Sequence, residues 1–199
     1  MGDNKILNQI YKYYPKNVSF NSKEYQNSPE YRRQMQKRKI AYNDLEYKQY
    51  LGKKLEKIFE GFAVRDWTDL ESYNCYEYRI LLHKNQEICD DDTDLIICLG
   101  NERSDIFLFI SVLEKYYYLT INKTKHTPLN KKWNFENTDE DTEYFEDEVK
   151  NLRNFLQDEN YTELSEKTAK TVIDYIETES REAGDTRVFD CLFTDLIAI

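Results

Sequence analysis

Residues 105–121, DIFLFISVLEKYYYLTI, decide the fold expected of this chain. Two β-rich apolar runs, DIFLFISV and KYYYLTI, are joined by Leu113-Glu114-Lys115, which is the pattern of an antiparallel hairpin. The upstream segments AVRDWTDL (63–70) and CYEYRILLH (75–83) are also β-rich, and DLIICLG (94–100) is a short apolar run. Together these segments predict a central antiparallel sheet of four to six strands.

Helical spacing precedes the sheet. A short helix is expected over residues 4–13, where Pro15 would end it. Ser28-Pro29-Glu30 then combines an N-cap, a proline at the first helical position and an acid in the first turn. Apolar residues recur at helical spacing from there to about residue 60, which predicts one long N-terminal helix, kinked near Gly52.

Helical spacing also follows the sheet. Residues 123–141 are expected to form a loop, followed by two C-terminal helices over residues 144–156 and 164–176. Residues 186–199, TRVFDCLFTDLIAI, could return to the sheet as a final strand. The chain is therefore predicted to be one α+β domain, residues 1–199, with a long N-terminal helix and two C-terminal helices packed on the sheet.

Composition narrows the class of protein. The chain has 199 residues, and its 40% hydrophobic content is enough for a core of its own. No apolar run approaches the ~18 residues of a membrane span, and the N-terminus lacks the apolar core of a signal peptide. The four cysteines are widely spaced and form no CxxC pair. These features predict a cytoplasmic protein with reduced thiols and no membrane association.

The charge is unevenly distributed. The net charge is −10, yet residues 1–60 carry 13 Lys and Arg against 7 Asp and Glu, so the rest of the chain is strongly acidic. An acidic body repels nucleic acid and attracts a basic protein surface. We therefore expect a basic protein partner and no nucleic acid.

The densest acidic stretch is DEDTEYFEDE, residues 139–148. Thr138 and Asp141 have the spacing of a capping box, so the first carboxylates of this stretch can be explained as the start of a solvated helix. The later residues lie further along the expected helix and are predicted to face a partner. The predicted contact residues of this stretch are Glu143, Tyr144, Glu146, Asp147 and Glu148.

A second acidic run contributes Asp90, Asp91 and Asp92 to the predicted partner surface. A calcium loop beginning at Asp90 would need Gly at its sixth position and Glu at its twelfth, where the chain has Leu95 and Asn101. We therefore interpret the run as a polar turn before a buried strand rather than as a calcium site.

No pattern of catalytic residues is present. The chain has two histidines, His83 and His126, and contains no GxSxG, Walker A or GxGxxG motif. Zinc would need ligands such as Cys75, His83, Cys89 and Cys98, whose spacing fits no compact site. We expect no enzyme activity, no metal and no cofactor. An enzyme that acts through carboxylates ranks third, after the two binding functions described below.

Two further clusters have structural and functional interpretations. The basic run at residues 32–39 is interpreted as an exposed helix face rather than a phosphate-binding surface, because the net charge opposes nucleic-acid binding. The tyrosines at 116–118 would place rings on both faces of a strand. Tyrosine serves at core edges and at interfaces, and Tyr117 is included in the predicted partner surface.

The chain resembles the immunity proteins of bacterial polymorphic-toxin systems. The resemblance lies in YKYYPKNVSF (11–20), DIFLFISVLEKYYYLTI (105–121) and VFDCLFTDLI (188–197), and in the acidic α+β character without a catalytic set. It implies a protein that binds a cognate toxin domain and blocks its active site or substrate cleft. The alternative is a non-catalytic regulatory or scaffolding module that binds an endogenous basic protein.

Overall fold

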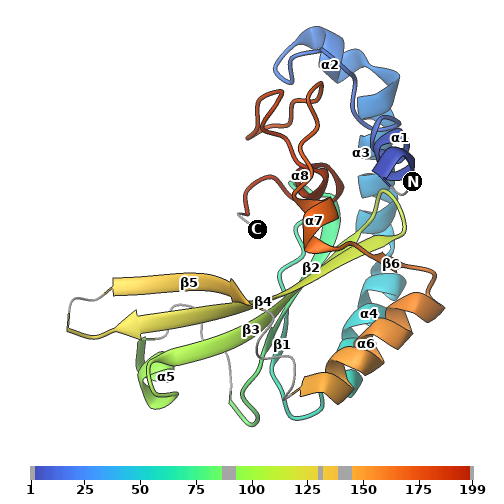
Figure 1. The fold of residues 1–199 in the computed structure, drawn as a ribbon. Coiled ribbons are helices and arrows are strands. Elements are labelled where there is room, and N and C mark those ends of the chain that lie inside the picture. The colour runs from blue at the N-terminus through green and yellow to red at the C-terminus, as the bar shows by residue number, and fades with distance from the viewer. Residues whose placement is uncertain (1–2, 87–92, 130–131, 139–144, 198–199) are drawn as a thin grey trace.

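The computed structural model describes residues 3–86, 93–129, 132–138 and 145–197, and its centre is the expected hairpin (Figure 1). Strand β3 (Glu102–Ser111) runs antiparallel to β4 (Tyr116–Thr127). Phe109 lies opposite Tyr118 in this pairing. The hairpin at the centre of an antiparallel sheet is thus confirmed.

Three more strands extend the hairpin into a meander. The order is β1-β2-β3-β4-β5, in which β1 (Val64–Asp66), β2 (Cys75–Leu81) and β5 (Lys132–Thr138) each pair antiparallel with their neighbours. The two-residue strand β6 (Thr162–Glu163) pairs parallel with the start of β4. Sheet and helices together form the α+β architecture that the sequence predicts.

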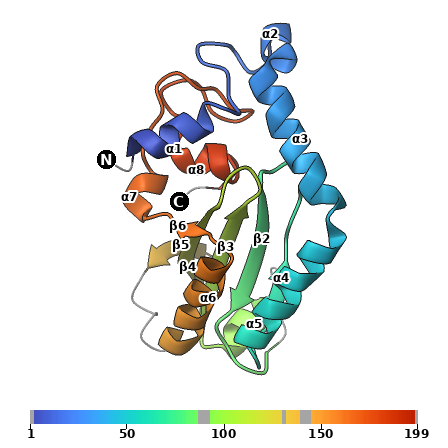
Figure 2. The same ribbon diagram turned by 90° about the vertical axis from the view of Figure 1, so that its right-hand side faces the viewer.

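Alternation along the strands gives the sheet two faces with different covers. The first face buries side chains such as Tyr78 and Leu108 beneath α4 (Leu45–Ile58) and α6 (Glu146–Asp158), which lie beside one another in Figure 2. The second face buries Phe109, among others, beneath α1 (Asp3–Ile10) and α8 (Val188–Leu192). At the other end of the second face, Leu95 from α5 (Thr93–Cys98) packs on Leu81 of β2.

The N-terminal helical region begins where the sequence predicts but is divided. After the short helix α2 (Lys23–Asn27), Ser28 Oγ accepts a hydrogen bond from Tyr31 N at 3.1 Å and begins α3 (Pro29–Asn43). The single long helix is corrected, because the chain breaks at Asp44 and not near Gly52. The Asp44 carboxylate accepts a hydrogen bond from Tyr47 N at 3.0 Å and starts α4 anew, which apolar spacing does not reveal.

The buried face of α3 is polar, contrary to the apolar stripe expected there. Met35 and Tyr42 are exposed, whereas Gln34 and Arg38 are buried. The Arg38 guanidinium donates to the backbone oxygens of Leu70 and Glu71, so α3 docks through side-chain donors onto carbonyls. One member of the basic run 32–39 is therefore structural.

Two central segments have a different structure from the one expected. Residues 94–100, expected as a strand, form most of the helix α5 (Thr93–Cys98), because a short apolar run fits a buried helix turn as well as a strand. The loop expected over residues 123–141 instead contains the end of β4 and β5. Trp133 on β5 packs against His126 on β4, with ring centroids 4.5 Å apart, and so contributes to this strand pair.

The C-terminal third differs most from expectation. The helix α6 is present, but the second expected helix shrinks to α7 (Glu166–Ala169), and the expected final strand contains the helix α8. The β-branched run 171–173 explains the loss of helix: Ile173 N donates to Thr186 O at 2.7 Å, so the chain folds back on itself.

No helix in the described part of the chain is long and apolar enough to cross a membrane.

Candidate functional site

The acidic residues predicted to face a partner form the first turn of α6. Residues 146–148 begin this helix, and Phe145 at the N-cap makes no side-chain capping hydrogen bond. Thr138, one member of the expected capping box, is the last residue of β5, and its partner Asp141 lies outside the described residues. Carboxylates at this position face the positive end of the helix dipole, which gives them a structural explanation.

Of the other predicted contact residues, five lie outside the described residues and one, Tyr117, is buried. Asp90, Asp91, Asp92, Glu143 and Tyr144 lie outside the described residues. Tyr117 is only 3% exposed, and its hydroxyl donates to Glu163 Oε2 at 2.9 Å. This side chain belongs to the face of the sheet beneath α6, so it is not part of an exposed surface.

A second acidic surface begins where the second expected C-terminal helix would end. Residues 171–197 contain seven carboxylates and two arginines, with no lysine or histidine. Most of these carboxylates belong to residues 174–185, which we call the acidic loop and which lies near α2 at the top of Figure 1. The exposed or half-exposed carboxylates of the acidic loop are Asp174, Glu177, Glu179, Glu182 and Asp185. Their density was visible in the sequence, but their loop conformation was not.

Contacts to distant parts of the chain fix the acidic loop in place. Asn17 N donates to Tyr175 O at 2.9 Å, and Phe20 N donates to Glu177 Oε2 at 3.1 Å. At the far end of the loop, Ser180 N donates to Asp195 Oδ2 at 2.8 Å. The loop is therefore held both by the N-terminal segment and by the residues that follow α8.

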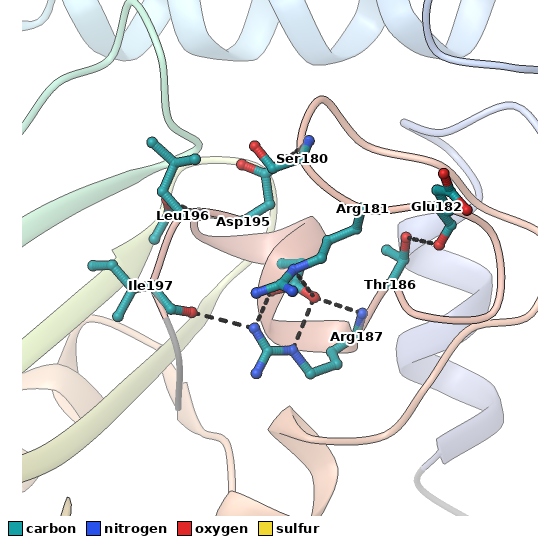
Figure 3. Close-up of polar contacts among 10 residues, drawn as sticks. Ser180, Arg181, Glu182, Thr186, Arg187, Asp195, Leu196 and Ile197 are labelled. Atoms are coloured by element: carbon teal, nitrogen blue, oxygen red, sulfur yellow. Dashed lines mark hydrogen bonds and ion pairs between the residues drawn. The ribbon is translucent and has the colours of Figure 1, made fainter. Parts of the chain in front are cut away.

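A buried ion pair anchors the end of the loop. The Asp190 side chain has no solvent exposure and accepts hydrogen bonds from Arg187 Nη2 at 2.6 Å and from Arg187 Nε at 2.9 Å. Arg181 Nε lies 3.9 Å from the same carboxylate. Figure 3 shows Arg181 and Arg187 converging from the loop and from the start of α8, with Ile197 O accepting a further bond from Arg187.

This anchor determines the charge that the loop presents. Arg181 and Arg187 are the only cationic side chains of residues 171–197, and both lie within 4.0 Å of Asp190. The five loop carboxylates and Asp195 form no ion pair with a described lysine, arginine or histidine. The result is a surface of six carboxylates whose local cations are turned inward.

Apolar side chains accompany these carboxylates. Val172, Tyr175 and Leu196 are 47%, 53% and 62% exposed, although each flanks or belongs to a segment with buried residues. Exposed tyrosine and aliphatic groups within a charged surface are typical of protein interfaces, where they supply buried contact area. The surface thus combines exposed apolar side chains, which a partner could bury, with surrounding carboxylates.

The elbow between α3 and α4 is a second exposed apolar feature. Ile40 and Leu45 are more than half exposed, and a groove of about 330 Å³ opens beside Ile40. The charges lining this groove are balanced, with Lys37 and Lys115 beside Asp44 and Glu114. The elbow therefore carries no electrostatic preference for a basic partner.

Cys75, Cys191 and the two histidines are packed into the fold, whereas the Cys98 thiol is exposed. Burial raises the pKa of the Cys75 and Cys191 thiols well above the ordinary value, which disfavours the reactive thiolate. His126 is buried against Trp133, and His83 Nε2 accepts a hydrogen bond from Ser104 N at 3.3 Å. Among the residues that the structure describes, no three His, Cys, Asp or Glu side chains gather as a metal site.

Comparison with known proteins finds no matching family model, no similar curated protein and no similar solved structure.

Proposed function

We propose that this protein is a non-catalytic binding protein that holds the acidic loop against a basic surface of another protein. The observation that carries the proposal is the placement of Arg181 and Arg187 at the buried Asp190. Because the only cations of the region are directed inward, the outward carboxylates are not neutralised locally. Such a surface gains most from a partner that supplies the positive charge.

The fixed geometry of the loop supports this proposal. A loop tied to the N-terminal segment and to the residues after α8 has already lost much of its conformational freedom, so less entropy is lost on binding. Carboxylates on a surface also steer a basic partner toward it, which raises the association rate at low ionic strength. Tyr175 and Leu196 would supply the apolar contacts that slow dissociation.

Within this proposal, the partner is a cognate toxin domain that the protein neutralises. A toxin that acts on nucleic acid needs a basic surface to hold phosphate, and an acidic loop can occupy that surface in place of the substrate. The support is the resemblance to immunity proteins together with the acidic loop. The residues at 146–148 begin α6 at the opposite end of the molecule (Figures 1 and 2), and we leave them out of the contact surface.

The test is site-specific photo-crosslinking in the cell that produces the protein. A photoreactive residue replaces Glu182 in the acidic loop and, as the matched control, Gln157 on the exposed side of α6. The proposal predicts a discrete cross-linked basic protein from position 182 and not from 157. Equal yields from both positions, or an acidic cross-linked protein, contradict it. If the cross-linked protein is basic but is not toxic when it is expressed alone, the partner is a regulatory protein and not a toxin.

A further inference from the structure

Between the ends of the second sheet face that pack against α8 and α5 lies an arginine with an unusual set of neighbours. Alternation along β2 places Glu77 and Arg79 on this face, together with Phe107 from β3, which lies directly opposite Arg79. Arg65 from β1 lies directly opposite Arg79 on the other side. Trp67 follows β1, and its backbone N donates to Glu77 O at 2.9 Å. Three strands thus bring two cations and two aromatic rings together.

One edge of the Arg79 guanidinium is already used. Its Nε donates to Glu77 Oε1 at 3.0 Å, and the Glu77 side chain is only 4% exposed. Burial raises the pKa of Glu77, and the attraction of Arg79 lowers it by less. The Glu77–Arg79 pair therefore fixes the direction of the guanidinium while it leaves the outer edge open.

Aromatic rings from the two flanking strands fix the plane of the guanidinium. The Arg79 Cζ atom lies 4.0 Å from the centroid of the Trp67 ring and 4.7 Å from that of the Phe107 ring. Guanidinium groups stack well on aromatic faces, and this stacking leaves the in-plane N–H donors free. The side chain is held in a defined orientation by three neighbours.

No group in the part of the chain that the structure describes bonds the outer edge of the guanidinium. Among the described residues, Nη1 and Nη2 of Arg79 make no hydrogen bond, and the side chain is 28% exposed. Arg65, directly opposite on β1, places a second positive charge beside Arg79. An incoming anion would therefore gain two oriented donors.

We propose that Arg79 is a binding site for a carboxylate group, which its Nη1 and Nη2 atoms hold through two parallel hydrogen bonds. The planar end of a guanidinium matches the two oxygens of a carboxylate. A monoanion suits the site better than a phosphate dianion, because Glu77 lies directly behind the guanidinium and the chain carries a net charge of −10. The carboxylate comes from a small acid or from the C-terminus of a peptide, and Trp67 and Phe107 favour an apolar group next to it. The site does not depend on the acidic loop.

Trp67 provides the readout, since it stacks on the guanidinium that would bind the ligand. The chain has two tryptophans, so the Trp133→Phe variant leaves Trp67 as the only indole. Its fluorescence is titrated with sodium acetate and sodium benzoate, with sodium chloride as the control at equal ionic strength. A saturable change with both carboxylates, at lower concentration for benzoate, is expected; a response identical to that of chloride contradicts the proposal.

Arg103 supplies a matched control for Arg79. It also donates from Nε to a carboxylate two residues away on the same strand, Asp105 Oδ2 at 2.8 Å, and it is 19% exposed, but no aromatic ring of the described residues stacks on it. In the Trp133→Phe background, Arg79→Gln should weaken benzoate binding by about tenfold or more, and Arg103→Gln should leave it unchanged. Equal losses in both variants contradict the assignment.

Two further comparisons separate a binding site from a structural ion pair and identify the source of the carboxylate. If Arg79→Gln does not fold, Arg79→Lys keeps the charge without the planar fork, and its response to benzoate should fall to that of chloride. A short peptide with a free C-terminal carboxylate is compared with the same peptide as an amide. Tighter binding of the free-acid peptide than of benzoate assigns a peptide C-terminus, and tighter binding of benzoate assigns a small acid. A saturable response to the amide equal to that of the free acid overturns the proposal.

Discussion

Arg187 gives three hydrogen bonds to the carboxylate of Asp190, two from its guanidinium and one from its backbone N at 2.8 Å. The backbone bond makes Asp190 part of the N-terminal cap of α8, and the guanidinium bonds neutralise its buried charge. One side chain therefore starts a helix, neutralises an arginine and fixes the end of the acidic loop. Its removal should affect the fold and the surface together.

Replacing Asp190 with Asn should lower the free energy of unfolding by about 2–3 kcal/mol, because Arg187 is left with an uncompensated, mostly buried charge. Urea denaturation measures this loss. Asp185→Asn is the control, since this carboxylate is exposed and should change stability by no more than about 0.5 kcal/mol. Similar losses in both variants would show that the Asp190 pair does not anchor the loop.

Gly184 should be required for the turn of the acidic loop. Its φ is +92°, in the turn where Asp185 N donates to Glu182 O at 3.1 Å, and an added Cβ would meet no atom within 4 Å. Gly184→Ala should therefore cost about 1 kcal/mol through backbone strain alone. Gly52→Ala inside α4 has equal space and should stabilise by about 0.5–1 kcal/mol. Thermal unfolding of both variants measures the difference, and a shift of the same sign in both contradicts this explanation.

Glu77 should make stability fall as the pH rises. Burial raises its pKa in the folded protein, so the folded state binds more protons than the unfolded state between pH 4.5, the ordinary pKa of a glutamate side chain, and the folded pKa. This contribution is fully present below pH 4.5 and is lost as the pH rises through the folded pKa. The Glu77→Gln variant cannot titrate at this position. Its free energy of unfolding minus that of the wild type should therefore be larger at neutral pH than near pH 4.5. A difference that does not change with pH, or that changes in the opposite sense, refutes the assignment.

The acidic first turn of α6 should act through the helix dipole. Asp147→Asn should cost about 0.3–1 kcal/mol at low ionic strength and less in high salt. Asp158→Asn at the other end of the same helix should stabilise slightly, because a carboxylate there faces the negative end of the dipole. Urea denaturation at two salt concentrations tests both changes. Equal destabilisation at the two ends would exclude the dipole as the cause.

Local patterns predicted the parts of the fold that depend on neighbouring residues. The hairpin at 105–121, the strand at 75–81 and the Ser28 cap follow from alternation and from capping chemistry, and each is present. The break at Asp44 could not be found in this way, because apolar spacing continues across it. Residues 171–173 were misassigned because their pairing partner, residues 186–188, lies far along the chain.

The candidate site was likewise predictable only where it depends on neighbouring residues and not where it depends on distant contacts. The excess of carboxylates in the acidic body was visible in the sequence, but local counting drew attention to residues 139–148 instead of 174–185. What distinguishes the acidic loop is the inward direction of Arg181 and Arg187, which depends on the burial of Asp190. Similarly, the stacking of Trp67 on Arg79 requires two strands to be in register.

The measurement that tests the central claim most directly is the association rate with the cross-linked partner as a function of salt. The wild type is compared with a variant in which Asp174, Glu179, Glu182 and Asp185 are replaced by their amides. We predict that the variant associates about tenfold more slowly at low ionic strength, and that the difference narrows as salt is added. Equal rates for the two proteins at low ionic strength would contradict the claim that the acidic loop is the binding surface.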